Sequence, residues 1–237
     1  MKFDILILAA GFGSRLKSLT KDKPKALVEY KKKKFIERQV KSFDEEIINK
    51  IIVVVGYKSN KIKTFLKAKF PNKKFLFIKN NNYKRNSSGQ SFFYAHKFIK
   101  TKEYIHLNCD CIFTKTLMDK IVKSKKKNLI SVRSDLMLKD KMENAEVYKN
   151  QIIQMKLTTN KKRKFKAFGV AKISRKAMYK NIKLYKKLSS DEKLRVNYFS
   201  LVRKNLKNIK YFAIKTDKKN LHEINSQQDL KNCILND

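Results

Sequence analysis

The first half of the chain alternates short apolar runs with longer amphipathic segments. Phe3–Leu8 and Lys50–Gly56 are almost continuously apolar, as expected for strands buried on both faces of a parallel sheet. The segments between such runs carry apolar residues at helical spacing. From about Glu143 to Ile173 the pattern changes to shorter strands. This order predicts an α/β fold with a mostly parallel, mixed sheet and helices on both of its faces.

The same patterns give the expected elements one by one. Strands are predicted at Phe3–Leu8, Lys50–Gly56, Phe75–Ile78, Tyr104–Leu107, Leu129–Val132, Ala145–Tyr148, Gln151–Lys156, Phe168–Ile173 and Tyr211–Ile214. Helices are predicted near Phe35–Phe43 and at Asn60–Ala68, Ser91–Ile99, Met118–Lys123, Ser174–Tyr179, Asn197–Asn205 and Ser226–Leu235, the last capped by Ser226. No internal repeat or linker is visible, so a single domain over residues 1–237 is expected.

A glycine-rich turn follows the first predicted strand. Gly11 and Gly13 let the backbone approach a ligand closely and can point its N–H groups toward phosphate. Arg15 and Lys25 follow at fixed distances and are positively charged at neutral pH. The order fits a triphosphate site, although a plain strand-to-helix connection could also use two glycines. The candidate nucleotide-binding residues of this segment are Leu8, Ala9, Ala10, Gly11 and Gly13.

Residues 8–27 resemble the signature LxxAGxGxRLxxLTxxxPKxL of the nucleotidyltransferase family that makes nucleoside-diphosphate sugars and CDP-alcohols. Eight positions in register behind a predicted strand are far more specific than a glycine pair alone. The resemblance implies a Rossmann-like three-layer fold of the nucleotide-diphospho-sugar transferase type. It runs over most of the chain and is greatest to the small single-domain cytidylyltransferases of the choline-phosphate type. The matching positions are Gly11, Gly13, Arg15, Leu19, Thr20, Pro24, Lys25 and Leu27.

Asp110 is the expected metal ligand. It follows the predicted strand Tyr104–Leu107, and ligands of open α/β sheets bind beyond the carboxyl ends of strands. Mg²⁺ prefers carboxylate oxygen and shares its coordination with substrate phosphates. The resembling family ends this strand in a (D/N)-G-D motif whose last Asp binds the metal, and here Cys109 replaces the glycine. The alternative is an Asp that only caps a turn.

The second metal ligand is expected late in the chain. Choline-phosphate-type enzymes carry an acidic residue in a late aromatic segment, but the matching residues 197–200 contain no carboxylate. Residues 221–226 resemble the family's Glu-Ile-Asp-(Thr/Ser) segment with Asn225 in place of Asp. An amide oxygen can also bind Mg²⁺, so we expect Asp110 and Asn225 as ligands, with Glu223 in support. His222 is expected to be a surface or packing residue.

Two further segments complete the candidate site. Residues 85–91, Arg-Asn-Ser-Ser-Gly-Gln-Ser, are similar to the family's base-recognition loop, with Ser88, Gly89, Gln90 and Ser91 as matching positions, although Ser and Gly also cap ordinary helices. An acceptor with an ammonium group would need aromatic faces or carboxylates. The candidates for acceptor binding are Glu146, Tyr198 and Phe199, each of which could equally be a packing or surface residue.

Net charge suggests another class of function. The chain has 59 Lys and Arg against 20 Asp and Glu, a formal charge of +39, and basic domains often bind nucleic acid. However, 51 of the basic residues are Lys, and they are spread along the whole chain. Base-reading modules favour Arg with interleaved aromatics. A specific nucleic-acid partner is therefore not expected, whereas a weak attraction to anionic membrane surfaces is.

Cysteine use and hydropathy bear on the expected cellular location of the protein. Cys109, Cys111 and Cys233 are odd in number, and alternate residues of a strand face opposite ways, so the Cys-x-Cys pair is not expected to share a metal. Reduced core cysteines are expected instead. No apolar run approaches the length of about 18 residues that a membrane helix needs. The first residues also lack a signal-peptide pattern, so a cytoplasmic location is predicted.

These observations together predict a Mg²⁺-dependent nucleotidyltransferase. Arg15 would hold the β- and γ-phosphates of a nucleoside triphosphate, and Lys25 would contact the α-phosphate and the acceptor phosphate. The favoured reaction transfers CMP from CTP to a small phosphorylated acceptor, of the phosphocholine or phosphonate kind, for cell-envelope biosynthesis. The alternatives are a sugar-1-phosphate nucleotidyltransferase for surface polysaccharide, a basic nucleic-acid-binding protein and a catalytically inactive paralogue. The same hypothesis includes association of two copies as a homodimer.

Overall fold

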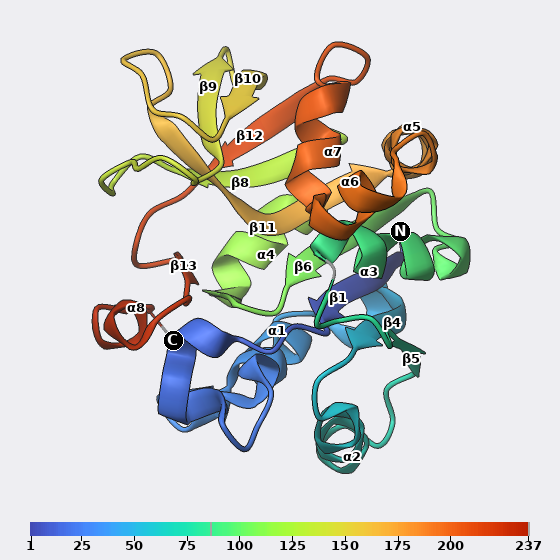
Figure 1. Cartoon of the computed structure of the whole chain (residues 1–237). Coiled ribbons are helices and arrows are strands. Elements are labelled where there is room, and N and C mark those ends of the chain that lie inside the picture. Colours follow the sequence, from blue (N-terminus) through green and yellow to red (C-terminus); the bar gives the residue numbers. More distant parts are fainter. Residues whose placement is uncertain (86, 237) are drawn as a thin grey trace.

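A nine-stranded sheet runs through the whole molecule (Figure 1). The computed structural model describes residues 1–85 and 87–236. The order of the strands in the sheet is β5-β4-β1-β6-β11-β8-β12-β10-β9, and two small two-stranded sheets, β13-β7 and β2-β3, lie beside it. The strands are β1 (Phe3–Ala9), β2 (Glu29–Tyr30), β3 (Lys33–Lys34), β4 (Ile48–Val55), β5 (Phe75–Lys79), β6 (Glu103–Asn108), β7 (Cys111–Phe113), β8 (Leu129–Arg133), β9 (Asn144–Tyr148), β10 (Gln151–Lys156), β11 (Phe165–Ser174), β12 (Tyr211–Lys215) and β13 (Leu221–Glu223).

Helices cover both faces of this sheet. The α-helices are α1 (Phe35–Lys41), α2 (Ser59–Lys69), α3 (Ser88–Ala95), α4 (Lys115–Lys123), α5 (Arg175–Lys186), α6 (Ser190–Arg195), α7 (Tyr198–Asn205) and α8 (Gln227–Lys231), and short 3₁₀ helices span Ser14–Thr20, Lys25–Leu27, Glu45–Ile47 and His96–Phe98. Among the described residues, none of the helices has both the length and the apolar character needed to cross a membrane.

Successive residues of β1 point to opposite faces and so divide the core into two layers. Ile5 and Ile7 pack with residues of α1, α2 and α4, whereas Leu6 and Leu8 pack with residues of α3, α5 and α7. Every residue of β1 is buried, which is why its sequence is continuously apolar. The predicted three-layer α/β fold is therefore confirmed.

The sheet is parallel in its first part and largely antiparallel in its second. β1 pairs in parallel with β4 and with β6, and β4 pairs in parallel with β5. β11 then pairs antiparallel with β6, β8 and β9, and only β8 and β12 are parallel there. The carboxyl ends of β1 and β6 consequently lie side by side, with Leu8 opposite Asn108. The segments that follow these two strands must start from the same edge of the sheet.

The predicted strands all form, with bounds that shift by at most three residues, but several helices differ from the prediction. The helix expected at Ser91–Ile99 begins at Ser88, and the one expected at Ser174–Tyr179 continues to Lys186. The last helix begins after Ser226, whose side chain forms a capping box with Asp229, as the predicted cap requires, but it ends at Lys231 and does not reach Leu235. The glycine turn leads into a 3₁₀ helix kinked at Lys17 instead of an α-helix. The strands β2, β3, β7 and β13 and the helix α6 were not predicted.

The buried face of β1 yields a stability prediction. Replacing Ile5, which is 0% exposed, by Ala should lower the free energy of unfolding by about 2–5 kcal/mol, because it leaves a cavity in a packed layer. The matched control is Ile153→Ala on β10, where the side chain is 46% exposed. That change should stay within about 0.5 kcal/mol. Urea unfolding of both variants measures the difference, and equal losses would contradict the assignment of the core.

Candidate active site

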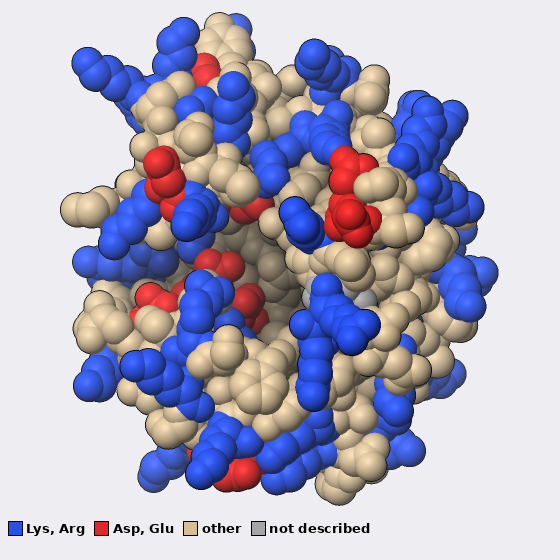
Figure 2. Space-filling model, viewed as in Figure 1, with Lys and Arg blue, Asp and Glu red and all other residues tan. Residues whose placement is uncertain are grey.

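A cavity of about 800 Å³ opens at the carboxyl ends of β1 and β6. Figure 2 shows it as a hollow in the middle of a face that is otherwise covered largely by Lys and Arg, with acidic side chains at its rim. Its lining comes from segments far apart in the sequence. The charged residues of the lining are Arg15, Lys25, Lys139, Lys141 and Lys166, and Asp110, Asp140, Glu143, Glu223 and Asp229. The lining thus has as many acidic as basic residues, although the whole chain has 59 Lys and Arg and only 20 Asp and Glu.

The glycine turn forms one wall of this cavity. Gly13 has φ 74°, a left-handed conformation that side chains disfavour. Its carbonyl accepts hydrogen bonds from the Leu16 amide and the Thr20 hydroxyl, both at 3.0 Å. A Cβ on Gly13 would lie 2.9 Å from Cβ of Lys25. The turn therefore packs directly against Lys25, and only glycine allows this approach.

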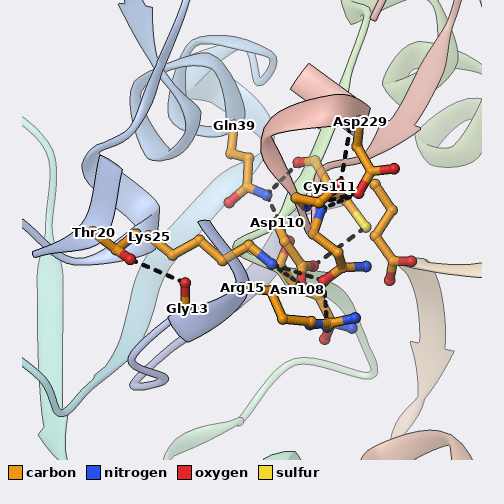
Figure 3. Close-up of polar contacts among 12 residues, drawn as sticks. Gly13, Arg15, Thr20, Lys25, Gln39, Asn108, Asp110, Cys111 and Asp229 are labelled. Atoms are coloured by element: carbon orange, nitrogen blue, oxygen red, sulfur yellow. Dashed lines mark hydrogen bonds and ion pairs between the residues drawn. The ribbon is translucent and has the colours of Figure 1, made fainter. Parts of the chain in front are cut away.

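Arg15, Lys25 and Asp110 lie close together at the centre of the site (Figure 3), and Asn225 bonds both cations there. Nζ of Lys25 donates to Oδ2 of Asp110 and to Oδ1 of Asn225, each at 2.9 Å. Nη2 of Arg15 donates to the same Asn225 oxygen at 2.8 Å. The two predicted cations and the two predicted metal ligands, which lie up to 210 positions apart in the sequence, thus meet at one point.

Lys25 is charged although it is only 7% exposed. Burial is the largest single effect and lowers the pKa of its ammonium, but the charge and hydrogen bond of Asp110, together with the neighbouring Cys109 and Glu223, raise that pKa above its ordinary value. The ammonium therefore keeps its proton at neutral pH. It is a fixed positive charge at the point where the turn and the carboxylate meet.

Two short strands bring Asn225 to Asp110. β13 pairs antiparallel with β7, with Glu223 opposite Cys111, and the Ile224 amide donates to the Asp110 carbonyl at 2.9 Å. The Asp229 carboxylate accepts from the Asn225 and Ser226 amides at 2.9 and 2.8 Å. The late segment is therefore fixed both by the small sheet and by the start of α8.

The oxygen donors of this cluster suit a hard divalent cation. Asp110 and Glu223 offer carboxylates and Asn225 an amide oxygen, which are the ligand types that Mg²⁺ takes. Ligand atoms of Asp110, Cys111 and Glu223 all lie within 4.8 Å of one another. Burial and the Asp110 charge raise the pKa of the Cys111 thiol well above its usual range, so it stays protonated and is a poor ligand. Burial likewise raises the pKa of Cys109 to about 12. All three cysteines are free and buried, as predicted.

The base-recognition loop enters the site only in part. Ser88 lines the cavity, but the Gly89 amide donates to the Val196 carbonyl at 3.1 Å. A Cβ on Gly89 would lie 2.5 Å from that carbonyl oxygen, so this glycine serves the packing of α3. Gln90 is turned away and accepts a hydrogen bond from the Tyr185 hydroxyl. We therefore drop Gly89 and Gln90 as base contacts. Asn86, which belongs to the same loop, lies outside the described residues.

The acceptor candidates divide in the same way. Phe199 lines the cavity, whereas Tyr198 and Glu146 do not. Tyr198 is 1% exposed, stacks on His106 with ring centroids 3.9 Å apart and bonds the Tyr104 hydroxyl at 3.1 Å. We therefore drop Tyr198 and Glu146 from the set. Ala9 also faces away, because its side chain packs with Ile5 and Ile7 on the opposite face of the sheet.

Some lining residues were not singled out by the sequence. Lys166 on β11 reaches the cavity and bonds Glu223 at 2.6 Å, and Glu143 lines it while paired with Arg203. Asn80 and Asn108 also line it, each at the carboxyl end of a strand. Only these last two had a usable signal, since polar residues that end buried parallel strands lie where ligands bind. Lys166 is one lysine among 51 and could not be distinguished.

Comparison with known proteins identifies a family for the first part of the chain. Residues 5–138 match the model of the MobA-like NTP transferase domain family. CTP:phosphoglutamine cytidylyltransferase of Campylobacter jejuni is 35% identical over 132 residues, which are 54% of this chain and 51% of that protein. Choline-phosphate cytidylyltransferase of Streptococcus pneumoniae is 45% identical over 65 residues, 27% of this chain and 28% of that protein. The chain thus spans about half of the length, or less, of the curated relatives it matches.

The similarity of the fold to solved structures covers nearly the whole chain. The solved structure of the inositol-1-phosphate CTP transferase from T. maritima superposes with a TM-score of 0.80, covering 96% of this chain and 91% of that one. At 17% sequence identity this likeness shows the fold alone.

The two glycines of the turn should respond differently to substitution. Gly13→Ala should lower the free energy of unfolding by about 1–2 kcal/mol, because the new methyl group meets Lys25 and the left-handed backbone is strained. Gly11→Ala is the control, since a Cβ there meets nothing within 4 Å. It should change stability by less than about 0.5 kcal/mol. Chemical denaturation measures both, and a larger loss for Gly11→Ala would refute the strain argument.

Proposed function

The chain belongs to the MobA-like NTP transferase domain family, and from this premise we propose that it transfers CMP from CTP to a small phosphorylated acceptor and releases pyrophosphate. One observation carries the proposal. The glycine turn with Arg15 and Lys25 and the late segment with Asn225 converge on Asp110 in a single cavity. That arrangement supplies fixed positive charge and oxygen ligands at the same point, which is what a triphosphate with its cation requires.

The choice of CTP rests on the relatives. The two curated relatives and the solved structure are each named for cytidylyl transfer, with phosphoglutamine, choline phosphate or inositol 1-phosphate as the acceptor. Their acceptors differ in the organic group and share a phosphate. We infer the phosphate as the common feature that this cavity recognises, and Lys166, which points into it beside Glu223, supports a second anionic group there.

The glycine turn, together with Arg15 and Lys25, would bind the phosphates of the nucleotide. Gly11 and Gly13 leave room for phosphate oxygens close to the backbone. The Arg15 guanidinium would hold the β- and γ-phosphates with its planar fork. Lys25 would contact the α-phosphate, where negative charge increases during the transfer. Both cations bond the Asn225 amide oxygen, so they are held side by side where phosphate oxygens would bind.

Asp110, Asn225 and Glu223 are the residues that would hold Mg²⁺. The ion would neutralise phosphate charge and orient the α-phosphate toward the acceptor. The acceptor phosphate is already an anion, so the chain needs no general base, and none of its residues has to move a proton. Its task is to align an acceptor oxygen with the α-phosphorus opposite the departing pyrophosphate. Phe199 and Lys166 face the cavity where the acceptor would lie.

The reaction is tested by pyrophosphate release. The purified protein is incubated with Mg²⁺, with CTP, UTP, dTTP, GTP or ATP in turn, and with phosphocholine, phosphoglutamine, inositol 1-phosphate or a sugar 1-phosphate. Release with CTP and one of the first three acceptors is the expected result. Release only with a sugar 1-phosphate would select the alternative, an NDP-sugar-forming enzyme. Absence of release with every pair would contradict the proposal.

Lys25 provides the sharper test. Lys25→Met keeps the length of the side chain and removes its charge, and it should lower kcat by roughly 100- to 1,000-fold, as loss of one preorganised charge does elsewhere. The matched control is Lys21→Met, an exposed lysine close to it in the sequence that does not line the cavity. This control should retain wild-type kcat. A Lys25→Met enzyme with near-normal turnover would refute the role given to this residue.

A further inference from the structure

Asn108 is the last residue of β6 and lines the cavity two positions before Asp110. Its amide oxygen lies 3.1 Å from Nε2 of His106, two residues earlier on the same face of the strand. No group in residues 1–85 or 87–236 accepts a hydrogen bond from its amide nitrogen, Nδ2. One end of the amide is therefore occupied and the other faces the cavity.

The buried ring of His106 determines which end of the Asn108 amide, the oxygen or the NH₂ group, faces the ring. His106 is 0% exposed, and its Nδ1 has no partner within the described chain. An amide oxygen can only accept a hydrogen bond, so the ring nitrogen that faces it must carry the proton. The proton therefore belongs on Nε2, which donates to Oδ1 of Asn108. Burial also lowers the pKa of His106 to about 4, so the ring is neutral.

Two further contacts hold this pair in place. The His106 ring stacks on Tyr198 with an interplanar angle of 16°, and Tyr198 in turn bonds Tyr104. On the other side the Asn108 amide lies over Gly169 of β11, so closely that a Cβ there would be 2.3 Å from its nitrogen. The amide thus has one orientation, with its NH₂ group toward the cavity.

The position of Asn108 indicates what it would meet. It is opposite Leu8, near the end of the strand that leads into the glycine turn, and it lines the same cavity as Ser88. It therefore reaches the cavity at the strand end next to the one that leads into the turn that would hold phosphate. A neutral NH₂ donor at this place suits an oxygen of the nucleotide.

Resting on the proposed function, we propose that Asn108 donates a hydrogen bond to an oxygen of the bound nucleotide, and that His106 is the positioning residue that aims it. Asn108 contacts the ligand, and His106 acts only through Asn108. Glycine at position 169 provides the room that the amide needs.

Direct binding of CTP with Mg²⁺, measured by calorimetry without an acceptor, tests this. Asn108→Ala should raise the Kd for CTP about five- to tenfold, the effect of one lost hydrogen bond. Asn108→Asp, which keeps the shape but not the donor, should bind at least as weakly. His106→Phe keeps the ring and its stacking and removes the N–H, so it should raise Kd by about threefold or more. Asn72→Ala, on an exposed turn, is the control and should bind as wild type.

The double variant distinguishes positioning from a structural effect. His106→Phe combined with Asn108→Ala should bind CTP no more weakly than Asn108→Ala alone, because His106 then has nothing to aim. The thermal midpoints of both single variants should remain near that of the wild type. Additive losses in the double variant would overturn the positioning role, and wild-type affinity of Asn108→Ala would overturn the contact. A wild-type protein that binds none of the five triphosphates would overturn both this inference and the proposed function.

Discussion

The parallel pairing of β1 with β6 is the constraint on which the site depends. It sets Leu8 beside Asn108, so that the glycine turn after one strand and Asp110 after the other begin at neighbouring points. A shift of one residue in this register would turn every side chain of β6 to the other face. Asp110 would then face away from Lys25, and His106 would lose its place next to Tyr198. Both strands are buried on two faces, and burial of their apolar residues is what fixes the register.

Several charged groups at the cavity are paired with an opposite charge. Lys25 lies against Asp110, Lys166 against Glu223 and Arg203 against Glu143. A partly buried charge without a partner would be costly, and paired removal from water reduces that cost. A substrate that brings both phosphate and a divalent cation offers new partners to both members of a pair. Ion pairs within the protein could thus be replaced by ion pairs between the protein and a phosphate–cation substrate.

The sequence predicted the parallel half of the fold well, because strands buried on both faces are apolar throughout. The strand end also pointed to Asp110, and the resemblance to the family's motifs pointed to Arg15, Lys25 and Asn225, which the structure brings together at one cavity. It did not reveal β7 and β13, which are three residues long and too short for a periodic pattern. Tyr198 and Phe199 were indistinguishable as aromatic neighbours, yet the helix turns one to the core and the other to the cavity. Gly89 and Gln90 matched a binding loop, but Gly89 bonds Val196, directly after α6, and Gln90 bonds Tyr185 of α5.

The surplus of Lys outside the cavity has a consequence for how copies of this protein meet. Each molecule carries a formal charge of +39, and like-charged molecules repel over roughly a Debye length, about 10 Å at 0.1 M salt. Close approach of two copies therefore requires condensed counter-ions, or an anionic body between them, to offset the repulsion. Polyphosphate, acidic polymer or crowded anionic metabolites would act as such a bridge. Association between copies is accordingly expected to depend strongly on the anions and the salt around them.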